Sequence, residues 1–151
     1  MQNAHAGEIA AAYAYRGHWK SLEESPEKIR IKEIEAEEWE HRTRVGEWLA
    51  KLDAKPNAVR EKIFWMIGRT LGATCFLSGW FMPMYFAGRL ESGNVVEYED
   101  AAAFARKLEM DDCVEDLLDM ARVEAEHELF FRGMVTGHRL LPTMKWIFGW
   151  S

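Results

Sequence analysis

The feature that most constrains the fold is an ionisable pair within an apolar helical stripe, and it occurs twice. In residues 26–52 the stripe consists of Ile34, Val45, Trp48 and Leu52. Glu38 and His41 fall on this same face, because a helix repeats every 3.6 residues. Glu35, Glu37 and Glu40 point elsewhere around the helix, as expected for a solvated face. Two ionisable groups of this segment therefore face the core.

The second instance lies in residues 111–136. Its stripe consists of Leu117, Met120, Phe131 and Met134. Glu124 and His127 lie in the middle of it. Each segment thus presents Glu-x-x-His, with the two side chains adjacent on one helix face. One such pair would indicate only a surface salt bridge, but two pairs inside apolar stripes indicate a buried polar centre.

Burial of these groups requires compensation, because an unpartnered buried carboxylate is strongly destabilising. Di-iron helical bundles supply it with two metal ions, held by two Glu-x-x-His helices and one Glu from each of two further helices. We therefore predict an all-α, ferritin-like four-helix bundle with one long crossover and a short apolar C-terminal tail. Two iron ions are the expected cofactor, and manganese is the alternative because it accepts the same ligands.

The first helix offers one choice for its ligand. Glu8 is the only acidic residue before Glu23, and it shares a helix face with Ala11, Ala12 and Tyr15. Glu8 is therefore the expected ligand of this helix.

The third helix leaves its ligand open. The candidates are Glu91, Glu97 and Glu99. Glu91 lies in line with four residues that form a candidate inner face: Met84, Ala87, Asn94 and Tyr98. Internal symmetry does not decide, because Glu91 and Glu97 lie 33 and 27 residues before Glu124, against 30 from Glu8 to Glu38.

Length, charge and cysteine content limit the remaining options. The 151 residues suit a single domain over 1–151. A net charge of −6 argues against nucleic acid as a partner. The two cysteines, Cys75 and Cys113, are too few for a disulfide scaffold, and no signal peptide opens the chain. We expect a cytoplasmic protein. The alternative is a protein that is bound peripherally to a membrane.

Helical periodicity predicts helices over residues 4–21, 26–52 and 111–136, and over some or all of residues 58–108. In this last stretch we expect a bend near Pro83 and breaks whose positions periodicity does not give. The run from Thr70 to Gly88 carries no charge, and we predict a buried bundle helix rather than a membrane span. The alternative is a helix partly exposed at a membrane surface. The tail of residues 140–150 holds Trp146, Phe148 and Trp150. Because it is so apolar, we expect it to contact a second copy of the chain or a membrane surface.

These residues resemble the demethoxyubiquinone hydroxylase family, a ferritin-like di-iron family of ubiquinone synthesis. The resemblance runs from about Ala4 to Phe131. The opening His5-Ala6-Gly7-Glu8 is similar to the family's first ligand motif, and Glu38-Trp39-Glu40-His41 stands at the family's separation from it. Residues 72–79 resemble the glycine-spaced start of the family's third helix.

The later motifs extend the resemblance. Glu91, twelve residues beyond Gly79, stands at the position of the family's third-helix ligand, and Tyr98 follows where the family also has Tyr. Residues 124–127, Glu-Ala-Glu-His, match the last motif. The resemblance favours Glu91 over Glu97, which replaces a residue that is usually His in the family.

The resemblance implies a set of site residues. The implied metal ligands are Glu8, Glu38, His41, Glu91, Glu124 and His127. Glu97 is the alternative ligand or a neighbour of the site, and Tyr98 is the candidate catalytic residue.

The implied function is a di-iron monooxygenase that uses O2 and an electron donor to hydroxylate a small apolar, quinone-like or aromatic substrate. The alternative is a ferritin-like iron oxidase or a rubrerythrin-like peroxide-handling protein. Glu97 as an additional carboxylate near the site would fit that alternative.

Overall fold

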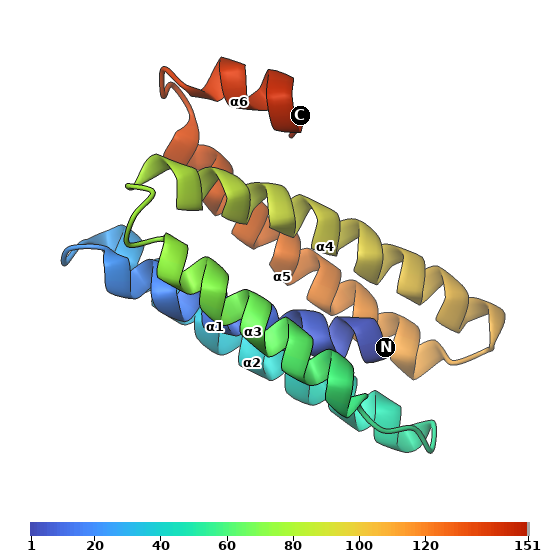
Figure 1. The fold of residues 1–151 in the computed structure, drawn as a ribbon. Helices are drawn as coiled ribbons and strands as arrows, with labels where there is room; N and C mark the ends of the chain where they lie inside the picture. The colour runs from blue at the N-terminus through green and yellow to red at the C-terminus, as the bar shows by residue number, and fades with distance from the viewer. Residues whose placement is uncertain (151) are drawn as a thin grey trace. The chain divides into compact units, whose positions relative to one another are not determined.

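The structure is a computed structural model that describes residues 1–150. Over these residues it contains six α-helices and no strand (Figure 1). The helices are α1 (Gln2–Ser21), α2 (Pro26–Lys51), α3 (Ala58–Thr74), α4 (Phe81–Lys107), α5 (Asp111–Val135) and α6 (Leu141–Phe148). The predicted all-α class is confirmed, and this all-helical content is consistent with a ferritin-like helical bundle. The chain forms two compact units, residues 1–80 and the residues from Phe81 onward.

In the first unit, α1 packs against both α2 and α3. Local sequence explains where two of these helices begin. Ser25 caps α2 by accepting a hydrogen bond from the backbone N–H of Lys28, and Pro26 opens the first turn. Asn57 caps α3 in the same way through the N–H of Arg60.

Glycines bring α3 against α1. Gly68 and Gly72 are the buried residues of α3. A Cβ on Gly68 would overlap the backbone of Ala10, and one on Gly17 would overlap the backbone of Gly72. The two helix backbones therefore touch through their smallest residues, and the large apolar side chains of α3 lie on its other faces.

This packing predicts a large penalty for Gly17→Ala. The added methyl group would meet backbone, which cannot rotate away, so we expect the metal-free protein to lose about 1–3 kcal/mol of unfolding free energy. Gly7→Ala in the same helix is the control, because nothing lies within 4 Å of its Cβ position. That variant should gain about 0.5–1 kcal/mol from helix propensity. Urea unfolding measures both, and equal effects would contradict the close approach.

In the second unit, α4 and α5 pair side by side as a hairpin (Figure 1). The helical stretch expected within residues 58–108 is divided into α3 and α4, and the break, whose position the sequence did not give, lies at residues 75–80. We predicted a bend near Pro83, but Pro83 lies in the first turn of α4. It is the third residue of α4, where no earlier carbonyl of the helix needs its missing N–H.

The C-terminal tail folds back onto α4 and α5. The Tyr85 hydroxyl donates to the carbonyl of Gly149 (3.0 Å), and Arg89 Nε donates to the carbonyl of Phe148 (2.7 Å). The Trp150 indole donates to Glu128 Oε1 (2.9 Å) and lies against Gly88, which has no side chain to block it. Trp150 is 8% exposed, whereas Trp146 is 86% exposed. One of the tail's tryptophans is thus buried within its own unit and another faces outward.

Among the described residues, no helix is both long and apolar enough to cross a bilayer. The uncharged run 70–88 is shared between the end of α3, the connecting loop and the start of α4. The prediction that this run is one buried helix is therefore wrong.

Candidate metal centre

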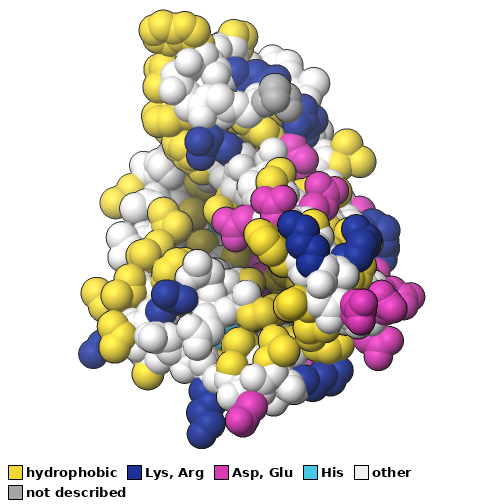
Figure 2. Space-filling model, turned by 90° about the vertical axis from the view of Figure 1, so that its right-hand side faces the viewer, with side chains coloured by type: hydrophobic (Ala, Val, Ile, Leu, Met, Phe, Trp, Pro, Cys, Tyr) yellow, Lys and Arg dark blue, Asp and Glu magenta, His cyan; other side chains and the backbone are white. Residues whose placement is uncertain are grey.

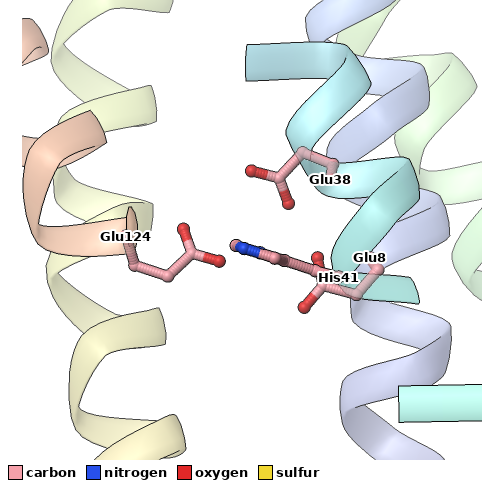
Figure 3. Close-up of side chains that lie close together, drawn as sticks. All are labelled: Glu8, Glu38, His41 and Glu124. Carbon is pink, nitrogen blue, oxygen red and sulfur yellow. The ribbon is translucent and has the colours of Figure 1, made fainter. Parts of the chain in front are cut away.

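The first unit gathers three of the predicted ligands. Glu8 on α1 and Glu38 and His41 on α2 offer ligand atoms that all lie within 4.8 Å of one another. All three side chains are buried. Figure 3 shows them pointing to the same side of the α1–α2 pair. Glu38 and His41 are adjacent because three residues make nearly one helical turn.

The flanking residues of α2 explain why these polar groups face inward. Ile34 and Val45 are fully buried on the same face, so their burial carries Glu38 and His41 into the core. Leu52 was predicted to belong to this stripe, but it lies just beyond the end of α2 and is exposed.

The second unit gathers the other three. Glu91 on α4 and Glu124 and His127 on α5 also offer ligand atoms within 4.8 Å of one another. All three are completely buried. His127 Nδ1 lies 3.3 Å from Glu124 Oε2. Asn94, one turn beyond Glu91, donates a hydrogen bond from Nδ2 to Glu91 Oε2 (2.9 Å).

The electrostatics of this second group favour a cation. Burial raises the pKa of Glu91 well above its ordinary value, and the neighbouring Glu124 raises it further, while His127 and Asn94 act in the opposite direction. Two carboxylates held together away from water repel each other when both are ionised. A divalent metal ion held by these residues would offset that repulsion.

Glu91 and Glu97 are clearly distinguished by burial. Glu91 is 0% exposed, whereas Glu97 is exposed. Helix α4 continues without a break through both positions, so a separation of six residues turns their side chains about 120° apart. Glu97 therefore does not share the inner face of Glu91, which keeps Glu91 as the expected ligand.

Tyr98 lies seven residues after Glu91, about two turns along the same helix, and is buried. It thus lies on the Glu91 face of α4, as predicted from the sequence. Its catalytic role stays a prediction.

Two polar contacts were missed in the sequence. Asn94 was placed on the inner face but not recognised as the hydrogen-bond donor to Glu91. Glu35 was expected on a solvated face, yet it is buried and accepts hydrogen bonds from Arg16 and Trp19 of α1. Glu35 lies about one turn before Glu38 on α2, and this position could have indicated that the side chain is buried against α1.

The donor set fits the predicted metals. Carboxylate oxygens and imidazole nitrogens suit iron and manganese, and each unit holds two glutamates and one histidine with ligand atoms close together. The structure thus presents buried groups that could bind a metal in both units. The ligand role of each residue stays a prediction.

Comparison with known families gives one match. The family model described as "Ubiquinone biosynthesis protein COQ7" matches residues 1–99. The match includes Glu8, Glu38, His41 and Glu91, and it ends before Glu124 and His127. No curated protein and no solved structure matches the chain.

Proposed function

Because the chain belongs to the family of the ubiquinone biosynthesis protein COQ7, we propose that it is a binuclear iron monooxygenase that hydroxylates an apolar, quinone-like ring. The observation that carries this proposal is the division of ligands between the units. Each unit brings together two glutamates and one histidine in buried positions. The sum, four glutamates and two histidines, is the ligand set of di-iron bundle proteins.

In this proposal the residues of the chain have three roles. Glu8, Glu38, His41, Glu91, Glu124 and His127 hold the two ions. When bound, the ions would supply the activation of O2 that no side chain can provide. The buried setting of the ligands excludes water from the oxidising centre. Tyr98, which lies on the Glu91 face of α4, is proposed to donate and accept a proton at its phenolic oxygen.

The overall reaction balances with an external donor. One oxygen atom of O2 enters a ring C–H bond, and the other leaves as water, so two electrons and two protons must be supplied. The proposal therefore includes an electron donor, whose identity the fold does not specify.

The function is tested with the iron-loaded protein, a chemical reductant and a short-chain methoxyquinone with one free ring position. We expect a product with one added oxygen atom that comes from oxygen-18-labelled O2. Rapid consumption of Fe(II) and O2 without such a product would contradict the proposal and favour the iron-oxidase alternative. The exposed position of Glu97 counts against that alternative, since it removes the additional carboxylate that would have suited it.

We further propose that the outer face of α3 docks on a membrane surface, where an apolar quinone would be found. This face consists of exposed apolar residues at helical spacing: Val59, Ile63, Met66, Ile67 and Leu71. Figure 2 shows hydrophobic side chains exposed at the surface with Lys and Arg among them. Apolar faces with nearby cations bind the interface of anionic bilayers.

Substitution of Ile63 and Ile67 by glutamate together is expected to weaken binding to anionic lipid vesicles roughly tenfold or more, because each isoleucine would bury apolar area in the bilayer. Vesicle flotation measures this. Leu129→Glu on α5, at a more exposed apolar position than either isoleucine, is the control and should bind as the unmodified protein does. Unchanged binding of the α3 variant would contradict the proposal. A solution dimer that the same double substitution dissociates would assign the face to a second copy.

A further inference from the structure

A polar junction ties together the three helices of the first unit. Glu61 of α3 contacts His5 of α1 through Oε1 (2.8 Å to Nδ1) and Arg42 of α2 through Oε2 (2.6 Å to an Nη atom). Arg42 also donates a hydrogen bond to the backbone carbonyl of His5 (2.6 Å). The side chains of Glu61, His5 and Arg42 are only 15%, 9% and 20% exposed. The junction is thus a largely buried network and not a surface ion pair.

Both partners of Glu61 stand next to proposed metal ligands. Arg42 directly follows His41 on α2, and His5 lies three residues before Glu8 on α1. Arg42 binds the backbone carbonyl of His5. In an α-helix the carbonyl of one residue accepts a hydrogen bond from the N–H four residues later, so this carbonyl belongs to the helical turn that contains Glu8. The junction therefore fixes the backbone of α1 against that of α2 at the level of the ligands.

The charge state of Glu61 makes this junction strong. Burial acts to raise the pKa of Glu61, but the hydrogen bonds from His5 and Arg42 outweigh it and hold the pKa below its ordinary value. The ionised carboxylate only accepts hydrogen bonds, so His5 Nδ1 carries the hydrogen that it donates. A buried bond between charged partners is stronger and more directional than a neutral one.

We propose that Glu61 is a positioning residue of the metal centre: through His5 and Arg42 it sets the register of Glu8 against Glu38 and His41. The inference rests on the proposed metal centre and goes beyond it, since α3 supplies none of the proposed ligands. Helix α3 packs on α1 through glycines, which fix the distance between the helices but provide no directional polar contact. Glu61 provides this directional polar contact with α1, and through Arg42 it also links α3 to α2.

The test measures metal affinity and not turnover. Co(II) reports on carboxylate and histidine sites through its visible absorption, so it is titrated into the full-length metal-free protein and into Glu61→Gln and Glu61→Ala. Loss of outer residues that orient ligands typically weakens metal binding 10–100-fold, and we expect a loss of this size for Glu61→Ala. Glu61→Gln keeps the size of the side chain and should fold, while it places an amide where Arg42 needs an acceptor. Its affinity should fall as well, by a smaller factor.

Glu35→Gln is the matched control. Glu35 is another buried carboxylate that joins α1 to α2, through Arg16 and Trp19, but these α1 partners lie eight and eleven residues beyond Glu8. We expect Glu35→Gln to lower the melting temperature of the metal-free protein at least as much as Glu61→Gln does, with little change in Co(II) affinity. This separates positioning of ligands from general stabilisation.

The outcomes distinguish the inference from the proposed function. If the unmodified protein binds two Co(II) ions and both Glu61 variants bind them equally tightly, Glu61 has no positioning role and the metal centre stands. If Glu35→Gln and Glu61→Gln lose affinity in proportion to their loss of stability, the effect is structural and the inference is wrong. If the unmodified protein binds no Co(II), the metal centre and the inference both fail.

Discussion

Replacement of Glu91 by alanine is expected to lower the iron content of the reconstituted protein from about two ions per chain to about one or fewer. Glu91 is fully buried and its carboxylate lies close to Glu124 and His127, so no water-exposed group can take its place as a ligand. The loss should not come from unfolding. Removing a carboxylate whose pKa is raised by burial and by Glu124 relieves repulsion in the metal-free protein, which should melt at the same temperature or higher.

Glu97→Ala is the control for this result. Glu97 lies on the same helix and carries the same charge, but its side chain is exposed, so the iron content should stay near two ions per chain. Metal analysis after reconstitution with ferrous iron and gel filtration gives both numbers. The reverse pattern, with iron lost in Glu97→Ala and kept in Glu91→Ala, would show that the ligand of α4 has been wrongly assigned.

The inward direction of the ligands was predictable because helical periodicity is a local property. Ile34 and Val45 lie on the face that also carries Glu38 and His41, and their complete burial carries the two polar groups with them. The same argument held for Leu117 and Phe131 around Glu124. Glu91 was placed on a candidate inner face by periodicity, but the spacing of the ligands along the chain left Glu97 open as well, and the family resemblance favoured Glu91.

The break between α3 and α4 was not predictable from these patterns. Residues 70–88 are uncharged throughout, so hydropathy gives no boundary. Pro83 attracted the prediction of a bend, yet proline is also favourable in a first turn, and a single sequence does not separate the two cases. The break instead contains Gly79 with φ of +72°, a conformation that glycine adopts without strain.

Contacts between segments distant in the sequence could not be predicted either. No pattern in the sequence indicates that His5 is buried against Glu61, 56 residues later. His18 is also buried, which lowers its pKa to about 4, and no sequence pattern indicates that burial. Periodicity shows which face a residue occupies, whereas the partner on another helix follows from packing, as between Gly17 and Gly72.

Removal of the metals is expected to lower the melting temperature, and the difference between loaded and metal-free protein should shrink as the pH falls. Binding to the native state alone adds about 2.7 kcal/mol when the free metal is 100 times its dissociation constant. The pKa of Glu91 is raised in the folded protein, so between its unfolded and folded pKa values the native state binds more protons than the unfolded state. The metal-free protein therefore gains stability as the pH is lowered through that window. Protons also compete with the metal for Glu91 and His127, which weakens binding over the same range.

The comparison of the two forms is needed because His18 acts in the opposite direction. Its folded pKa of about 4 lies below the ordinary value of 6.5, so its contribution to stability is present above pH 6.5 and is lost as the pH falls toward about 4. His18 affects the loaded and metal-free forms alike and cancels in their difference. Thermal melts of both forms from neutral pH to about pH 5 measure that difference. Equal melting temperatures at neutral pH would contradict a metal centre in this fold, and a difference that widens in acid would contradict the raised pKa of Glu91.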